Sequence, residues 1–208
     1  MRSLFFSSDP VDDDDGDRFD GRSERIPSFE PPRDEIPVLS GPAGLLARAD
    51  DVVIALMGVR VFSDGVEFLL DRHLRRGGRD PREWQLAQMD FAGHFGVADR
   101  TPGRLRWGLS LGDGQRLLLD DPFGFPDPHR HDAPSEPQRH TVRVTGGGGS
   151  GGGDDYTMHD GLWLWPLPPE GPLDIVVQWT TFGVAESRFS LDGGHLRALA
   201  AGVRPLWE

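Results

Sequence analysis

The sequence predicts an all-β fold, an antiparallel β-sandwich of Ig-like or Greek-key type with two short helices. Apolar residues alternate with a period of two through several short segments, as they do in strands that bury one face. The chain of 208 residues also contains 28 glycines and 18 prolines, so turns and loops must be frequent. Many short strands between turns are typical of a sandwich, whereas regularly alternating strands and helices would indicate a parallel α/β sheet.

Two hairpins carry the clearest alternation. Residues 52–62 and 66–74 flank a turn that contains Asp64 and Gly65, and an Asp-Gly pair between β-rich segments is a strong hairpin signal. A second hairpin joins residues 105–111 to residues 116–119 through Gly-Asp-Gly. Each pattern predicts a pair of antiparallel strands.

Two helices are predicted from their capping residues. Asp80, Pro81 and Glu83 supply the N-cap, the first-turn proline and the capping-box carboxylate of a helix over residues 81–95. Asp192 caps a second helix that ends near Val203. The remaining strands are expected over residues 141–145, 162–165, 173–180 and 186–191.

The chain divides into a tail and one domain. Residues 1–35 are acidic and hold few aliphatic side chains, so we expect a disordered acidic tail there. Residues 36–208 predict a single β-sandwich domain. Within it, the segments near 121–139, which contains five prolines, and near 146–155 are expected to be mobile loops.

Charge and residue usage restrict the function. The formal net charge of −12 argues against nucleic acid or an anionic membrane as a partner, because both attract cationic surfaces. All 22 basic residues are arginine and cysteine is absent, which excludes Schiff-base lysines, thiol nucleophiles and zinc–thiolate sites. The chain shows neither a signal peptide nor an apolar run of membrane-spanning length, so we expect a cytoplasmic protein.

The tract Gly146 to Gly153, seven glycines and one serine, admits three interpretations. An engineered linker would join two proteins, but residues 154–208 are too few for a comfortable core of their own. A phosphate loop needs a helix N-terminus, and Ser150 matches the G-x-S-x-G nucleophile elbow only because glycine is repeated. We therefore expect a native, mobile connection between strands of one sandwich.

The residues after this tract supply the candidate site. On a strand, Trp163 and Trp165 share one face, where they form either an aromatic platform for a sugar or peptide or part of the core. Nearby carboxylates and an imidazole are groups that general acid–base catalysis uses. The candidate binding residues are Trp163, Trp165, Tyr156, Asp154, Asp155, His159 and Asp160.

Histidines offer a further alternative. His129, His131 and His140 lie near Asp127 and Asp132, and imidazole and carboxylate are common metal ligands. These residues fall in or beside the proline-rich segment, which would give the ligands no rigid support. We expect neither a metal nor a cofactor.

The C-terminal half resembles a known pattern. A glycine run and an Asp-Tyr step precede Trp-Leu-Trp-Pro-Leu-Pro-Pro at 163–169, and Val-Val-Gln-Trp and Phe-Gly-Val-Ala-Glu-Ser-Arg follow. Together with the hairpin at 59–68, this resembles a family of uncharacterised proteins from high-GC bacteria, over about two-thirds of the chain. The resemblance implies that the glycine tract is native, and it brings no activity, substrate or catalytic residue.

The functional expectation is a non-catalytic, cytoplasmic binding module with a protein partner. The surface around the glycine tract and Trp163 is the expected contact. The alternatives are a hydrolase that uses Asp154, Asp155, His159 and Asp160, and a histidine-bound metal protein. The oligomeric state is left open.

Overall fold

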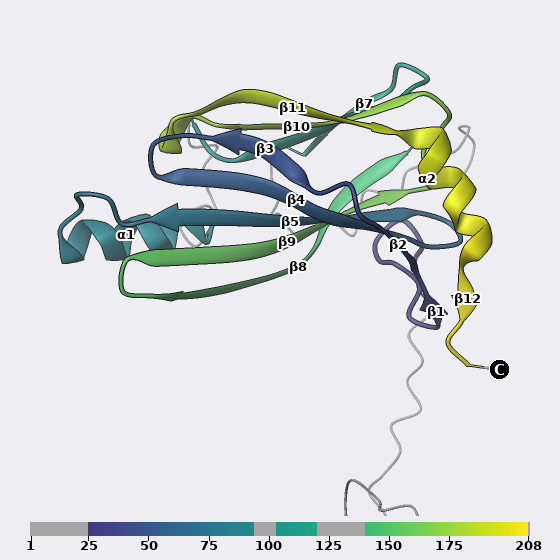
Figure 1. Ribbon diagram of the computed structural model, residues 1–208, viewed down its shortest axis with the longest axis horizontal. Helices are drawn as coiled ribbons and strands as arrows, with labels where there is room; N and C mark the ends of the chain where they lie inside the picture. Colours follow the sequence, from purple (N-terminus) through teal and green to yellow (C-terminus); the bar gives the residue numbers. More distant parts are fainter. Residues whose placement is uncertain (1–24, 94–102, 120–139, 208) are drawn as a thin grey trace, which may run out of the picture.

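The computed structural model describes residues 25–93, 103–119 and 140–207. They form two antiparallel sheets that lie one over the other, with a helix at each end of the sandwich (Figure 1). The strands are β1 (Glu35–Ile36), β2 (Val38–Ser40), β3 (Gly44–Arg48), β4 (Val52–Val61), β5 (Val66–Arg75), β6 (Arg106–Ser110), β7 (Arg116–Leu119), β8 (Thr141–Gly152), β9 (Asp155–Trp165), β10 (Pro172–Trp179), β11 (Val184–Asp192) and β12 (Arg204–Pro205). The helices are α1 (Pro81–Phe91) and α2 (Gly193–Leu199), with short 3-10 turns at Thr180–Phe182 and Ala200–Gly202.

The antiparallel sandwich that the sequence predicts is confirmed. The large sheet has the order β2-β4-β5-β9-β8, with β3 also paired to β4, and the small sheet has the order β11-β10-β6-β7. Both predicted hairpins are present as β4–β5 and β6–β7. The short strands β1 and β12 pair separately and bring the two ends of the described chain together. Within the large sheet, β9 pairs with β5 along the whole of β5, and with β8 on its other side.

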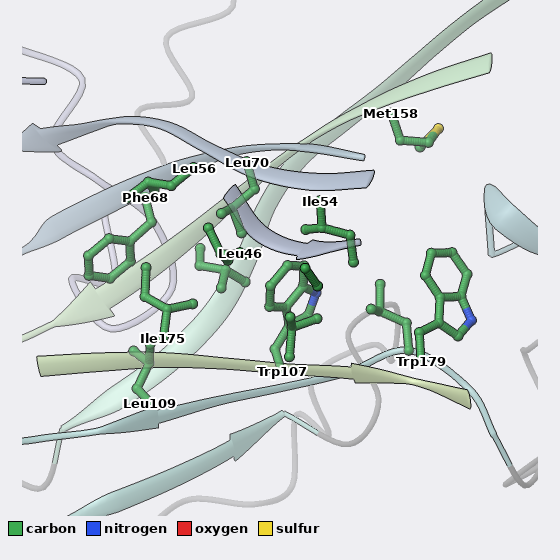
Figure 2. Close-up of a cluster of buried hydrophobic side chains, with 14 of the residues drawn as sticks. Leu46, Ile54, Leu56, Phe68, Leu70, Trp107, Leu109, Met158, Ile175 and Trp179 are labelled. Atoms are coloured by element: carbon green, nitrogen blue, oxygen red, sulfur yellow. The ribbon is translucent and has the colours of Figure 1, made fainter. Parts of the chain in front are cut away.

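The core fills the space between the sheets. Alternate residues of β4 and β5 are buried, because one face of each strand turns toward the small sheet. Figure 2 shows these side chains meeting indole and aliphatic groups of the opposite sheet. The facing residues include Ile54, Leu56, Phe68 and Leu70 from the large sheet, and Trp107, Leu109, Ile175 and Trp179 from the small sheet.

Both helices start where the sequence places them. The Asp80 side chain accepts from the backbone N–H groups of Arg82 and Glu83, and the Glu83 carboxylate accepts from the Asp80 N–H, which completes the capping box. Helix α1 ends at Phe91, earlier than the predicted residue 95, and Gly93 follows with φ 82°. Asp192 caps α2 through the N–H of His195. In the described part of the chain, no helix is long and apolar enough to cross a membrane.

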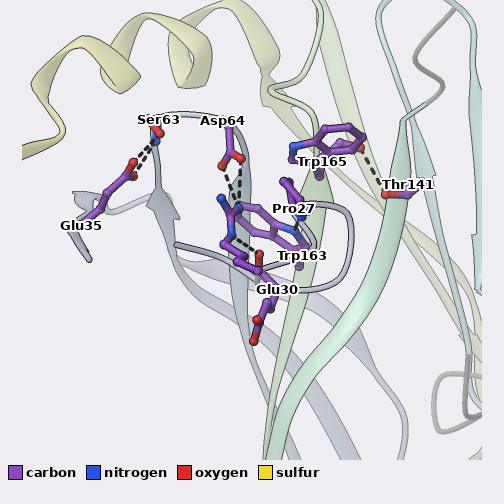
Figure 3. Close-up of polar contacts among 9 residues, drawn as sticks. Pro27, Glu30, Glu35, Ser63, Asp64, Thr141, Trp163 and Trp165 are labelled. Atoms are coloured by element: carbon purple, nitrogen blue, oxygen red, sulfur yellow. Dashed lines mark hydrogen bonds and ion pairs between the residues drawn. The ribbon is translucent and has the colours of Figure 1, made fainter. Parts of the chain in front are cut away.

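The predicted boundary of the acidic tail is wrong by about ten residues, since residues 25–35 contact the large sheet. Arg25 pairs with Asp64 in the β4–β5 turn. The indole N–H of Trp163 donates to the carbonyl of Pro27 at 2.8 Å, and the pair is visible in Figure 3. The Arg143 guanidinium lies 3.8 Å from the Phe29 ring centroid. An ion pair, a hydrogen bond and a cation–π contact thus hold this segment, which has few aliphatic side chains to bury. The rest of the predicted tail, residues 1–24, lies outside the described residues, as do residues 120–139 of the predicted proline-rich loop.

Candidate functional site at the glycine-rich edge

The glycine tract is a strand, and the predicted loop near residues 146–155 is wrong. Residues 146–152 continue β8, and residues 148–152 pair in register with residues 155–159 of β9. Glycine has a low intrinsic preference for strands, so the sequence pattern does not reveal this one. Cross-strand pairing with β9 determines the structure instead. In the described chain β8 is the last strand of the large sheet, and every residue from Gly146 to Asp155 is exposed.

Two glycines shape this hairpin by adopting left-handed backbone conformations. Gly146 has φ 69° where the register with β9 shifts, and a bulge of this kind favours glycine. Gly153 has φ 62° in the two-residue turn between β8 and β9, where a positive φ at the first position matches a type II′ turn. The Trp84 indole donates to the carbonyl of Gly153 at 2.8 Å, which ties α1 to the tip of the hairpin.

Two other glycines make room for side chains of β9. A Cβ atom at Gly149 would lie 2.6 Å from the Tyr156 hydroxyl oxygen and would also meet the Met158 sulfur. A Cβ atom at Gly151 would overlap the Tyr156 ring and lie 3.0 Å from the carbonyl oxygen of Asp155. Tyr156 and Met158 therefore lie across the bare backbone of β8 on the core side. At Gly148 and Gly152, by contrast, a Cβ atom would meet nothing within 4 Å.

This asymmetry predicts unequal effects of alanine along one strand. We expect Gly151→Ala to lower the free energy of unfolding by about 1–3 kcal/mol, because Tyr156 must move off the strand. Gly148→Ala adds the same methyl group in open space and should change stability by less than about 0.5 kcal/mol. Urea unfolding followed by circular dichroism measures both. Equal values for the two variants would contradict the packing described above.

The solvent face of the same hairpin carries a polar cluster that continues onto β5. The Nδ1 atom of His159 lies 2.7 Å from the Asp71 carboxylate, and the Nδ1 atom of His73 lies 3.1 Å from the Thr157 hydroxyl. The Nε2 atom of His73 is 4.0 Å from the second oxygen of Asp71. Asp71 thus stands between two imidazoles. Cross-strand pairing places Ser150 beside Thr157 in the same row. We name this set, Asp71, His73, Ser150, Thr157 and His159, the hydroxyl–imidazole row.

A cleft of about 650 Å³ opens at the end of this face, between β3, β4, β5 and β9. His73 and Thr157 line it, so the row extends into the cleft. Asp51, also in its wall, accepts from Arg75 and from Arg79, each at 2.9 Å. The hydrogen bond from Arg75 is the main reason that the pKa of Asp51 lies below its usual value, and Arg79 adds to it. Asp51 therefore stays ionised and binds both guanidinium groups, one negative charge against two positive ones.

The structure separates the four residues of the proposed acid–base cluster. Asp160 points into the core and pairs with Arg72, whereas His159 lies on the solvent face of the same strand. Asp154 in the turn pairs with Arg76, and Asp155 is exposed. These four side chains do not converge on one reaction site, because neighbouring residues of a strand face opposite sides of the sheet.

The three aromatic candidates, Trp163, Trp165 and Tyr156, do not form an exposed platform. Trp163 is fully buried under residues 25–30, and Trp165 is half-buried. Tyr156 points to the core side, where its ring lies 6.2 Å from that of Phe91. The aromatic-platform interpretation of Trp163 is therefore wrong. The other alternative, that Trp163 is packed in the interior, is correct. It packs beneath the N-terminal segment, however, and not between the two sheets.

A histidine-bound metal gains no support from the described residues. Among them, no group of three histidine, aspartate or glutamate side chains has the geometry to hold a metal ion. His140 forms a 3.1 Å hydrogen bond with the carbonyl of Leu167, which engages its Nε2 atom. His129 and His131, named in the metal hypothesis, lie outside the described residues.

Sequence reasoning missed Asp71 and His73 as members of the cluster. Both lie in the predicted strand 66–74, and their alternation with Arg72 and Leu74 shows that they face solvent. What the sequence does not show is that β5 pairs with β9, which sets Asp71 opposite His159. Only that register brings together residues separated by 88 positions.

The fold and the site together define a two-layer β-sandwich protein. Its large sheet ends in the glycine strand β8, which lies beside the hydroxyl–imidazole row. No protein-family model matches the sequence, and comparisons with curated proteins and with solved structures gave no match. The resemblance of about two-thirds of the chain to a family of uncharacterised bacterial proteins therefore stays an expectation.

Proposed function

We propose that this protein is a non-catalytic, cytoplasmic protein-binding module that takes up an extended segment of a partner along β8. The exposed glycine half of this edge strand is the observation that carries the proposal. An edge strand leaves a row of backbone N–H and C=O groups without a partner, and an added strand pairs with them. Proteins usually protect such edges with charged side chains, proline or covering loops. Residues 146–153 contain no charged side chain and no proline.

The surroundings of β8 also favour strand addition. Gly148 and Gly152 leave the solvent face of the strand open, so side chains of an incoming segment on that face meet no bulk at these two positions. Pairing with β9, the overlying Tyr156 and the hydrogen bond from Trp84 hold the strand in an extended conformation. A preorganised edge avoids part of the entropy that a mobile loop would lose on binding.

Amide hydrogen exchange tests this function within one strand. In an antiparallel ladder, alternate residues direct their N–H groups toward the neighbouring strand, and the pair that flanks a two-residue turn is hydrogen-bonded. We therefore expect the amides of Gly149 and Gly151 to face the free edge, and those of Gly148 and Ser150 to face β9. In the free protein, Gly149 and Gly151 should exchange fast and their neighbours slowly.

The binding step uses random twelve-residue peptides displayed on phage, with the selected sequences then synthesised. Selected peptides should slow exchange at Gly149 and Gly151 by at least about tenfold while Gly148 and Ser150 change little. Selection of no peptide, or of peptides that leave Gly149 and Gly151 unprotected, would overturn the proposal. Slow exchange at both glycines in the free monomer would also overturn it, because the edge would already be covered.

A further inference from the structure

We propose that the segment added to β8 is basic, with lysine or arginine side chains four residues apart on its solvent face. This inference rests on the function proposed above and names the chemistry of its partner. Residues Gly148 and Gly152 of β8 stand beside His159 and Asp155 of β9, respectively. Because neither glycine has a side chain, side chains of a strand next to β8 can reach across to those two residues.

The His159 end of this surface accepts hydrogen bonds. A carboxylate cannot donate, so the His159 Nδ1 atom, 2.7 Å from Asp71, must carry the proton of that contact. In the neutral ring the exposed Nε2 atom is then an acceptor, next to the negative charge of Asp71. An ammonium or guanidinium group placed over Gly148 meets both an acceptor and an opposite charge.

At the other end of this surface, Asp155 offers an exposed carboxylate beside its cross-strand neighbour Arg75. Asp155 is exposed, and no ion pair engages it in the described part of the chain. The arginines near this end are already engaged: Arg75 and Arg79 bind Asp51, and Arg76 binds Asp154. Between the two ends, Ser150 and Thr157 offer hydroxyl groups to the middle residue of an added strand. The predicted pattern on that face is basic, then small or hydroxyl-bearing, then basic.

A second copy of this chain fits the edge less well than a basic partner. Two copies would each bring a formal net charge of −12, and like charges repel at the short distance of a shared sheet. Charge complementarity therefore favours a positively charged segment.

Synthetic peptides test the preference. The first probe is a fluorescein-labelled nine-residue peptide that alternates threonine with valine, with lysine replacing the third and seventh residues. The second carries glutamate at the same two places, and the third keeps threonine there. At pH 7 and low salt we expect the lysine peptide to bind about tenfold more tightly than the glutamate peptide. The expected factor is modest because one exposed ion pair contributes less than about 1 kcal/mol. The preference should shrink as salt is added.

Variants locate the effect. Asp155→Asn and Asp71→Asn should each reduce the affinity for the lysine peptide about threefold, and leave that for the threonine peptide unchanged. Glu186→Gln removes the same charge from an exposed site on β11 of the other sheet, so it should have no effect. Circular dichroism checks that each variant is folded.

The outcomes separate this inference from the function itself. If all three peptides bind equally and protect Gly149 and Gly151, the partner is not basic but strand addition stands. If the lysine peptide binds without protecting these amides, the contact is a general attraction of charge and the inference fails. If no peptide protects them, both proposals fail. Analytical ultracentrifugation tests for a second copy as the occupant. Dimers that dissociate when a peptide protects the edge would show that a second copy binds there, and would contradict the proposal of a basic partner.

Discussion

Replacing Asp160 with alanine should lower the free energy of unfolding by about 3–5 kcal/mol, since it leaves the fully buried Arg72 without its counter-ion. Arg72 also donates to the carbonyl of Phe91 at 2.6 Å. Its guanidinium carbon lies 5.1 Å from the ring centroid of Phe91 and 5.2 Å from that of Trp179. Arg72 on β5 thus links α1 to both sheets, through Phe91 of α1, Asp160 on β9 and Trp179 on β10.

Urea unfolding of Asp160→Ala measures this effect, with Asp155→Ala as the matched control. Asp155 lies on the same strand but is exposed, so its loss should change stability by less than about 0.5 kcal/mol. The double variant Arg72→Met, Asp160→Leu should recover most of the stability, because apolar residues of similar volume often replace a buried ion pair. A loss below about 1 kcal/mol for Asp160→Ala would show that the pair is not held as described.

Replacing Trp163 with alanine should also lower the free energy of unfolding by about 3–5 kcal/mol. The indole is completely buried, packs edge-on against Phe62 at 5.6 Å and donates to the carbonyl of Pro27. Its removal uncovers the outer face of the large sheet and detaches residues 25–30. We therefore expect two results together: lower stability, and cleavage by trypsin after Arg25 under conditions in which the native protein resists it.

Trp207→Ala is the control for this second experiment, because that indole is 74% exposed. It should leave both stability and cleavage after Arg25 unchanged. Cleavage after Arg25 at the same rate in Trp163→Ala and in the native protein would indicate that the N-terminal segment does not depend on this indole.

Local patterns predict the parts of the fold that local forces determine. The β4–β5 hairpin follows from alternation and an Asp-Gly turn, and α1 follows from its capping box, so both can be found in the sequence. The extent of β8 cannot, because a run of glycines has no alternation and no strand preference. Its conformation is imposed by β9 and by Tyr156, through contacts that only the folded chain makes.

The sequence draws attention to the glycine tract but does not give the composition of the hydroxyl–imidazole row beside it. The region around the glycine tract and residues 154–160 is where the exposed edge lies, yet only His159 of the proposed acid–base group joins the polar cluster. Asp160 belongs to the core because β9 buries every second residue. Its partner Arg72 comes from a strand 88 positions away, and such a register is set by the whole sheet.

Tyr156 is the single tyrosine of the chain, and its ring lies across Gly149 and Gly151. That position makes it a natural spectroscopic reporter of the glycine edge. Isotope labelling of tyrosine alone would give one set of ring signals in a protein with six tryptophans and twelve phenylalanines. A strand that binds along β8 would lie beside the glycines that this ring covers, so its binding should shift the ring signals. Occupancy of the glycine edge can therefore be followed without a substitution in the protein.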